Sequence, residues 1–478
     1  MKSLDIRTAA VSIIGMAFLW PPLHTSAYYP LSIAFTSQTT PVAEISAYHV
    51  VYTIAFIAVA LLILLLRRRV QAAFDHSRAL PLGCAVLGAA GSLLLAASPA
   101  FGSANVAAVG AGIALVAFSY VPLLIAWGSR ATQLEPRTAA LVVIASYVLF
   151  SALWLMCSAL GIGDNALLVA APLVSGACLA AFPRLKQRSW AFELSALKPL
   201  PYEFVAPCII FVYFGVVCVK ALTVMQIGIR MGALTSFHLV VTAAVGLVIS
   251  IILLAIFWRK GYSSRSLVVA FALLVLCYMA SLLAVMLGLD SDYQSFYGKR
   301  ALVGTEHVIE LLLFMVLACA ARQHRISPAL SFGLYAIVVV AAPQFIASDL
   351  MYQTGMLDAL THLNLIVPLV AVASFVIAAV AIGLLVRMSA HSEATKHVPE
   401  NWQEELCRSA LADLDLSPRE FDVAVLAYRG YSAKAIASTL YVSESTVKTH
   451  TSHIYRKAGI HTKQELIAYV DQLAEAER

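Results

Sequence analysis

The chain has 478 residues, of which 61% are hydrophobic and only 12% are charged. Soluble globular domains carry about 25% charged residues, so this composition excludes an ordinary soluble protein and indicates a surface that mostly faces lipid. Basic residues exceed acidic ones, 32 against 26, for a formal net charge of +6 at pH 7. Many apolar runs extend for about 18 residues or more, enough to cross a hydrocarbon core of roughly 30 Å as a helix.

The apolar runs predict twelve membrane-spanning helices, and this even number places both ends of the chain on the same side of the bilayer. The expected spans are residues 9–35, 43–66, 80–98, 105–127, 138–160, 165–182, 202–226, 234–257, 266–288, 301–320, 329–348 and 362–386.

The basic residues between the spans predict the orientation, because cytoplasmic loops are enriched in lysine and arginine. With a cytoplasmic N-terminus, three basic residues fall in outer loops (Arg230, Lys299 and Arg300) and fifteen fall in inner loops. The inner set is Arg67, Arg68, Arg69, Arg78, Arg130, Arg137, Arg184, Lys186, Arg188, Lys198, Arg259, Lys260, Arg265, Arg322 and Arg325. We therefore expect a multi-pass protein of a bacterial cytoplasmic membrane, with both termini in the cytoplasm.

The longest inner loop, about residues 183–201, follows the sixth expected span and divides the twelve spans into six plus six. That layout resembles the major facilitator superfamily of transporters, which implies two helical halves around a central cavity. The loop after the second span, RRRVQAAFDHSRA, keeps Asp75 and the basic residues of the superfamily's pattern but lacks its glycines. The resemblance therefore leaves open whether the membrane domain transports.

After Arg387 the sequence becomes polar, and a compact segment follows from about residue 415. We expect a transmembrane sensor or transporter-like domain at 1–388, a cytoplasmic linker at 389–414 and a C-terminal domain at 415–478. The predicted fold is all-α throughout. It consists of a polytopic bundle of about twelve helices, followed by a domain of four short helices.

Capping residues divide the C-terminal domain into those four helices. Helix starts are signalled by Ser417, Ser432, Ser443 and Thr462, and helix ends by Gly430 and Gly459. The first and last of these starts have glutamate three residues later, which is the capping-box pattern. A tight turn between the second and third helices predicts a helix-turn-helix.

The third of these helices has two faces. Val447, Thr451, Ile454 and Ala458 recur at helical spacing and should point into the small core. The opposite face is polar and basic, with short side chains that permit close approach to bases and phosphates. The candidate DNA-binding residues on or beside it are Ser445, Lys448, Thr449, His450, Ser452, His453, Arg456 and Lys457. From charge alone, a merely solvated helix face is an equal alternative.

A specific set of motifs favours DNA. They are L-[ST]-x-R-E at 416–420, G-x-[ST]-x-K-x-I-A at 430–437, V-S-x-x-T-V-K-x-H at 442–450, I-x-x-K at 454–457 and Gly-Ile at 459–460. Spread over about 55 residues, these motifs resemble a LuxR-type helix-turn-helix domain. The resemblance implies that the third helix lies in the major groove and that the fourth can supply a dimer contact. It also implies that Lys448 and Thr449 approach bases, while Lys434, Thr446 and Lys457 contact the DNA backbone.

Ionisable residues inside membrane spans are costly, and they suggest function by default. The strongest candidates for ligand binding are Lys220 in the seventh span and Glu306, His307 and Glu310 in the tenth. Glu306 and Glu310 are four residues apart and so share one helix face. One interpretation is a ligand or gating site in which Lys220 pairs with a tenth-span glutamate. A buried ion pair that only fixes packing is the equal alternative.

The sequence gives almost no support to an enzyme. It contains no Walker loop, no dinucleotide-binding glycine pattern, no nucleophile elbow and no His/Asp/Glu cluster with metal-ligand spacing. The eight cysteines include no CxxC pair. We therefore expect no enzyme activity, no catalytic or metal-binding residues and no cofactor.

The two parts together predict a membrane-bound one-component transcription regulator. It would sense a small molecule through the transmembrane domain and bind promoter DNA through the helix-turn-helix. The expected partners are double-stranded promoter DNA, an unidentified small molecule, the lipid bilayer and a second copy of the chain on DNA. Two alternatives remain open, a transporter whose DNA-binding tail reports flux and a transporter whose tail binds a protein partner.

Overall fold

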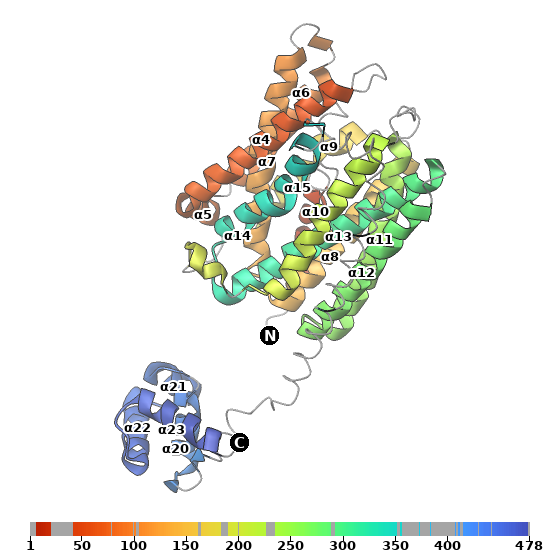
Figure 1. Cartoon of the computed structure of the whole chain (residues 1–478). Coiled ribbons are helices and arrows are strands. Elements are labelled where there is room, and N and C mark those ends of the chain that lie inside the picture. The colour runs from red at the N-terminus through yellow and green to blue at the C-terminus, as the bar shows by residue number, and fades with distance from the viewer. Residues whose placement is uncertain are drawn as a thin grey trace. The chain divides into compact units, whose positions relative to one another are not determined.

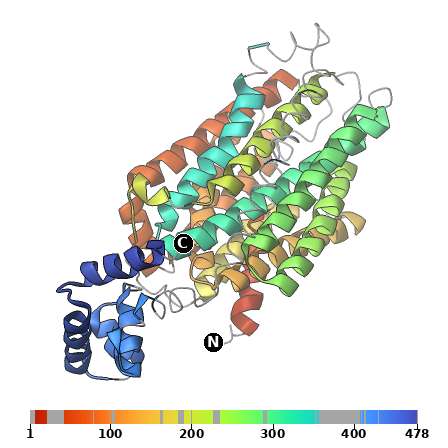
Figure 2. The same cartoon turned by 60° about the horizontal axis from the view of Figure 1, so that its bottom comes forward.

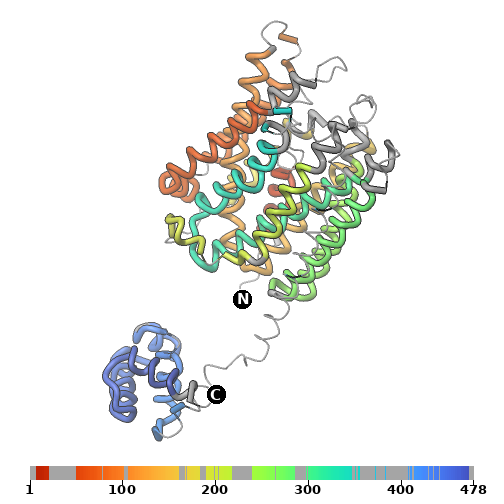
Figure 3. Tube along the Cα trace, in the orientation of Figure 1, coloured from red at the N-terminus to blue at the C-terminus, as the bar shows by residue number. Residues whose placement is uncertain are grey.

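In a computed structural model, the chain forms two compact units, residues 1–389 and 390–478 (Figure 1). The regular elements that the structure describes are helical, apart from a single parallel bridge between Ala191 and Ile326. The described residues, which are coloured in Figure 3, are 6–20, 42–77, 79–98, 100–101, 105–160, 164–182, 190–198, 200–225, 235–287, 292–350, 354–355, 372, 383, 407, 410–411, 414–428, 430–440 and 442–476.

The first half of the membrane unit consists of apolar helices and one short polar helix. They are α1 (Ile6–Ala17), α4 (Val42–Leu65), α5 (Arg67–His76), α6 (Ala79–Ala97), α7 (Asn105–Ala131), α8 (Pro136–Ala159) and α9 (Asp164–Ala181). Within this half, α6 packs on α7 and α9, and α1 packs on α8 and α9. These contacts bury one side of each helix and leave apolar side chains such as Leu65 and Val86 exposed, as expected for a surface that faces lipid.

The second half begins with the short 3₁₀ turn η2 (Leu194–Leu197). Its long helices are α10 (Tyr202–Met225), α11 (Thr235–Lys260), α12 (Ser264–Leu287) and α13 (Asp292–His324). A last helical stretch consists of α14 (Pro328–Tyr335), the π-helical η4 (Ala336–Ala341), α15 (Ala342–Gln344) and the π-helical η5 (Phe345–Leu350). Pro343 lies between the two π-helical pieces, where its missing N–H interrupts the regular ladder of hydrogen bonds.

The central helix of the membrane unit is α13. It packs against α10, α11 and α12 of its own half and against α7 and α8 of the first half. Figure 2 shows α11, α12 and α13 running side by side. Helix α8 pairs with α11, and α4 pairs with η4 and η5, so both halves contribute to a shared interface.

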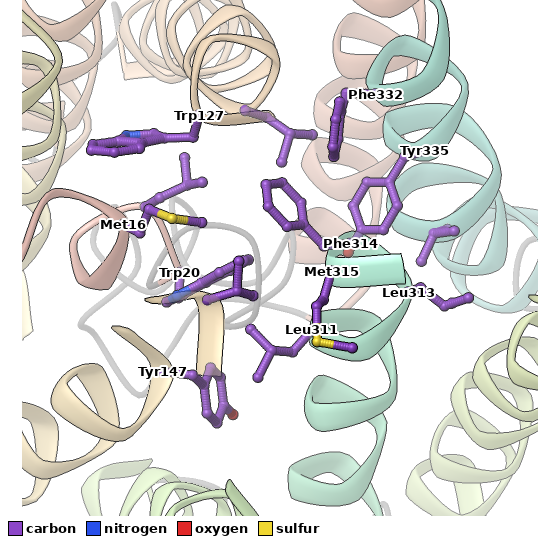
Figure 4. Close-up of a cluster of buried hydrophobic side chains, with 14 of the residues drawn as sticks. Met16, Trp20, Trp127, Tyr147, Leu311, Leu313, Phe314, Met315, Phe332 and Tyr335 are labelled. Atoms are coloured by element: carbon purple, nitrogen blue, oxygen red, sulfur yellow. The ribbon is translucent and has the colours of Figure 1, made fainter. Parts of the chain in front are cut away.

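Aromatic side chains fill part of that interface between the halves. Trp20 lies edge-on to Phe314, with ring centroids 5.4 Å apart, and to Tyr147 at 6.4 Å. The Trp20 indole N–H donates to Ser146 Oγ at 2.8 Å, which satisfies its buried polar atom. Phe314 in turn contacts Tyr335, and Figure 4 shows these rings gathered in one cluster. Around Trp20 and Phe314 the two halves therefore meet through packed side chains.

The helical membrane bundle expected from the sequence is confirmed in the part of the chain that the structure describes. Six helices there are long and apolar enough to cross a membrane, or seven if α4 and α5, bent by 87° at their junction, count as one span. The total of twelve stays a prediction, because the expected span at 362–386 and much of the one at 9–35 lie outside the described residues. Helix α13 begins at Asp292 and not at residue 301, since a helix can continue through polar residues beyond the apolar stretch.

Helix α5 lies in a segment that the sequence indicated only as a loop. Its buried Gln71 donates to Asp75 Oδ1 at 3.0 Å, and its side-chain oxygen accepts from the backbone N–H of Ala329 at 3.0 Å. The helix therefore holds the start of α14 from the opposite half. The spacing of Val70 and Phe74 carries a signal for an amphipathic helix, but the three preceding arginines obscure it.

The C-terminal unit contains α20 (Pro418–Tyr428), α21 (Ala433–Leu440), α22 (Glu444–Ala458) and α23 (Lys463–Ala476). The predicted caps are confirmed in detail. Ser417 N–H donates to Glu420 Oε2 at 2.9 Å, and Glu420 N–H donates to Ser417 Oγ at 3.3 Å. Gly430 and Gly459 have φ of 90° and 68°, which only glycine adopts at little cost. Local sequence thus marks where these four helices begin and where α20 and α22 end.

Candidate nucleic-acid interface and membrane-domain site

Helix α22 is fixed to its domain by one buried face. Val447 and Ile454 are completely buried in the core of the C-terminal unit, while Thr451 and Ala458 are half-buried. At the start of the helix, Ser443 Oγ accepts from the N–H of Thr446 at 3.1 Å. The predicted core face of the third helix is therefore confirmed, and the opposite face is held in a defined orientation.

That opposite face is exposed to solvent. Its exposed side chains are Ser445, Lys448, Thr449, Ser452 and Arg456. All were predicted to bind DNA, and the helix places them on one surface without a covering element among the described residues of this unit. Short hydroxyl side chains beside two cations form a surface that can approach both base edges and phosphates.

Four hydroxyls of this region already have local partners. Ser443 Oγ lies 2.7 Å from both Ser445 Oγ and Thr446 Oγ1, and Thr449 Oγ1 donates to the carbonyl of Ser445 at 3.1 Å. A hydroxyl can donate one hydrogen bond and accept two, so these groups keep acceptor capacity. His450 is half-buried beside them.

Lys448 has an acidic neighbour that the sequence reasoning did not single out. Its ammonium lies 3.2 Å from Glu444 Oε1, and the two side chains are 69% and 48% exposed. Glu444 is the first residue of α22, one helical turn before Lys448. The four-residue spacing of opposite charges was the signal that could have found this pair in the sequence.

Lys457 differs from Lys448, because its ammonium is bonded within the domain. It donates to Glu420 Oε2 at 2.9 Å and to the carbonyl of Asp415 at 2.7 Å. The Glu420 side chain is only 7% exposed, and His453 Nδ1 lies 3.4 Å from its other oxygen. The Lys457 hydrogen bond, together with the backbone N–H of Ser417, lowers the pKa of Glu420 to about 2. A DNA contact by Lys457 therefore stays a prediction, and the structure gives this lysine a second, internal partner.

Lys434, the remaining DNA-binding candidate, belongs to α21 (Ala433–Leu440). Its side chain lies outside the described residues. Helix α21 packs directly on α22, so the backbone at position 434 belongs to the helix-turn-helix pair.

Part of the expected linker belongs to the C-terminal unit. Cys407 and Leu411 are buried in the same core as Val447 and Ile454. On the far side of α20, the Tyr428 hydroxyl donates to Asp471 Oδ1 at 2.6 Å and so joins α20 to α23. Cys407 and Leu411, which fall in the expected linker, therefore belong to the core of the C-terminal unit.

In the membrane unit, α13 carries three of the four predicted ligand-binding residues. Glu306 and Glu310 are both buried, at 4% and 9% exposure, and His307 is half-buried. Glu306 Oε1 has no hydrogen-bond partner among the described residues. Lys220, the fourth candidate, belongs to α10, but its side chain lies outside the described residues.

Glu306 points toward α10. A side chain at Gly215 of α10 would collide with its carboxylate, and the same place lies close to the Tyr278 hydroxyl of α12. Tyr278 donates to the carbonyl of Phe211 at 3.0 Å. Helices α10 and α13 therefore approach each other closely at Gly215. The expected pairing of a tenth-span glutamate with Lys220 stays a prediction.

Polar contacts also join the two halves of the membrane unit near the predicted inner loops. Arg322 Nη1 donates to the carbonyl of Gln133 at 2.6 Å, and Arg137 Nη2 donates to the carbonyl of Trp258 at 2.9 Å. Each contact links one half to the other, as the Gln71 contact with Ala329 does. The halves are thus connected by discrete hydrogen bonds that a rearrangement would have to break.

Comparison with known families identifies the C-terminal domain. Residues 414–470 match the model of the bacterial regulatory proteins of the luxR family. The HTH-type transcriptional regulator MalT of Serratia proteamaculans (strain 568) is 33% identical over 88 residues, 17% of this chain and 10% of that protein. The oxygen regulatory protein NreC of Staphylococcus aureus (strain JH9) is 44% identical over 54 residues, 11% of this chain and 25% of that protein. This chain thus spans a quarter or less of the length of these relatives.

Comparison with solved structures identifies the fold of the membrane unit. The major facilitator superfamily transporter FucP, in its outward conformation, aligns with a TM-score of 0.54 and 14% identity, over 79% of this chain and 99% of that one. A bacterial homologue of the iron transporter ferroportin, in an outward-facing state, aligns with a TM-score of 0.52 and 13% identity over the same shares. At this identity the likeness concerns the fold alone. The chain therefore joins a LuxR-type helix-turn-helix domain at its C-terminus to a membrane domain with the fold of major facilitator superfamily transporters.

Proposed function

We propose that the protein is a membrane-bound one-component transcription regulator. The observation that carries this proposal is the exposed polar and basic face of α22, presented by a luxR-family domain that shares one chain with a membrane domain. A recognition helix of this kind reads base edges in the major groove, with flanking cations on phosphates. In this proposal Lys448 and Thr449 approach bases, while Lys434, Thr446 and Lys457 contact the DNA backbone. The remaining DNA-binding candidates are Ser445, His450, Ser452, His453 and Arg456.

In this proposal the membrane domain senses a small molecule and does not act as an enzyme. Glu306, His307 and Glu310 of α13, with Lys220 of α10, form the candidate ligand site between the seventh and tenth spans. A ligand that binds one arrangement of the two halves more tightly shifts the population toward it. The hydrogen bonds of Arg322, Arg137 and Gln71 between the halves are the contacts that such a shift would alter.

The output in this proposal is binding of two C-terminal domains to one promoter. A single helix-turn-helix module makes few contacts, whereas two modules held together gain effective concentration on adjacent half-sites. Both termini would lie in the cytoplasm of a bacterial cell, where the membrane-tethered domain can reach DNA.

The test is to crosslink the full-length protein to DNA in its own cells and sequence the bound fragments. We expect discrete promoter peaks that weaken by about 5- to 150-fold with Lys448→Ala, the range for loss of one base or phosphate contact. Arg419→Ala is the matched control, because it removes an exposed cation of the same domain, on α20. Absence of peaks for the wild-type protein, with the protein present in the membrane, would overturn the proposal.

The fold of the membrane unit favours a second candidate function, a working transporter with a regulatory tail. Its helices align with almost the whole length of two transporters. This alternative predicts saturable uptake of a substrate into vesicles, abolished by Lys220→Ala. A sensor predicts that Glu306→Gln changes the response of the promoter to inducer while uptake is absent from both proteins.

A further inference from the structure

An acidic residue stands at the edge of the DNA-facing surface of α22. Glu444 begins the helix, and its carboxylate lies 3.2 Å from the Lys448 ammonium. Exposed ion pairs of this kind contribute little to stability. The helix dipole also favours an acid in the first turn, but that preference does not require a lysine one turn later. The first residues of a recognition helix are the ones that reach base edges, where a carboxylate without a hydrogen-bond donor would be repelled by the phosphates.

The pair presents one donor group beside one acceptor group. An ammonium only donates hydrogen bonds, and an ionised carboxylate only accepts them. A G·C base pair shows the complementary arrangement in the major groove, with guanine N7 and O6 as acceptors and cytosine N4 as a donor. Guanine O6 and cytosine N4 are bonded to each other at about 2.9 Å, a normal N–H···O distance. That separation is close to the 3.2 Å between the charged atoms of Glu444 and Lys448.

The other base pairs fit this arrangement less well. A T·A pair also places an acceptor beside a donor, but the thymine methyl group would face the lysine, and adenine N7, a further acceptor, would face the carboxylate. The reversed pairs, C·G and A·T, bring donor to donor and acceptor to acceptor. The chemistry therefore selects one base pair in one orientation.

We infer that Glu444 and Lys448 act as one unit that reads a single G·C base pair, with Lys448 on guanine and Glu444 on cytosine. This inference rests on the proposed function, since it requires that α22 enters the major groove. It adds Glu444 as a specificity-determining residue, and it gives Lys448 a defined base and a defined orientation.

The experiment selects binding sites from randomised double-stranded DNA with the full-length protein in lipid nanodiscs, at one fixed salt concentration. We expect the wild-type protein to require G·C at one position of each half-site. Glu444→Gln should reduce the preference for G·C at that position by about 5- to 150-fold and leave the rest of the site unchanged. The charge swap Glu444→Lys with Lys448→Glu should reverse the preferred base pair there to C·G. Asp422→Asn, which removes an exposed acid from an ion pair on α20, is the control and should change nothing.

The outcomes separate this inference from the proposed function. A wild-type site that Glu444→Gln and the charge swap leave unchanged at every position would overturn the inference and leave DNA binding intact. Failure of the wild-type protein to enrich any sequence would overturn both. A uniform loss of affinity in Glu444→Gln, with the sequence preference retained, would assign the residue a structural role only and would also overturn the inference.

Discussion

Helices α13 and α22 carry most of the ionisable residues predicted to have a function, and they place them in opposite surroundings. On α13, Glu306 and Glu310 are buried between helices, and one oxygen of Glu306 has no partner among the described residues. On α22, Lys448 and Arg456 are exposed, and a buried apolar face holds the helix in place.

On α22, an exposed candidate residue can be replaced with little effect on stability. On α13, replacing a buried candidate residue is expected to change stability as well as function. Removing Lys448 or Arg456 from α22 takes away a proposed contact for DNA but exposes no core and breaks no buried hydrogen bond. The buried carboxyl of Glu306 on α13 destabilises the fold unless a partner binds it, because a buried polar group without a hydrogen-bond partner costs free energy. Lys457 is the exception on α22, since it is bonded to the buried Glu420.

The largest expected effect is a difference in stability between two lysine variants of α22. Lys457→Ala should lower the free energy of unfolding of the C-terminal unit by about 2–3 kcal/mol, because Glu420 loses the cation that neutralises it in a nearly buried position. Lys448→Ala should change that free energy by less than about 0.5 kcal/mol while it weakens promoter binding by about 5- to 150-fold. Hydrogen exchange of peptides from α22 in the full-length protein measures the change in unfolding free energy for both variants. Equal protection in the two variants would show that the internal ion pair has no special role.

The next effect concerns the close approach of Glu306 on α13 to Gly215 on α10. Gly215→Ala should destabilise the membrane unit by about 1–2 kcal/mol, since the added methyl group meets the Glu306 carboxylate across the α10–α13 contact. Glu306→Ala removes the colliding group, so the double variant should recover most of the loss.

Thermal unfolding in detergent, followed for the wild type, both single variants and the double variant, gives the coupling between the two positions. Gly110→Ala is the control, because nothing lies within 4 Å of a Cβ at that glycine. Additive losses in the double variant would contradict the close approach of Glu306 to Gly215.

The sequence predicted the C-terminal unit more completely than the membrane unit, for a physical reason. Capping serines and glycines act within a few residues, so Ser417, Ser443 and Gly459 determine helix ends without reference to the rest of the fold. The internal bond of Lys457 joins residues 37 positions apart, and no local pattern indicates it. A lysine at helical spacing on a basic face has the same sequence signature whether it faces DNA or a buried glutamate.

In the membrane unit the apolar runs predicted where helices lie but not what their polar residues contact. Helix α5 was missed because hydropathy detects only long apolar spans, and α5 is short and polar. Its Gln71 is buried through a contact with Ala329 of α14, which belongs to the other half of the unit. The close approach of Glu306 to Gly215 depends on how α10 and α13 pack, which the sequence of one span does not encode.

The smallest effect is a pH dependence that isolates Glu420. Because its pKa in the folded domain is lowered from 4.5 to about 2, the contribution of its ionised form is fully present above about pH 4.5 and is lost as the pH falls toward 2. We expect the urea concentration at the unfolding midpoint of the C-terminal unit, measured by pulses of an acid protease on the full-length protein, to fall across this window. Glu420→Gln should flatten the fall, because its amide does not titrate. Lys457→Ala should also flatten it, since without the ammonium the folded pKa returns toward 4.5. An unchanged slope in both variants would mean that other carboxyl groups govern the acid sensitivity, and that the Glu420–Lys457 pair fixes the geometry of α20 and α22 without making their stability depend on pH.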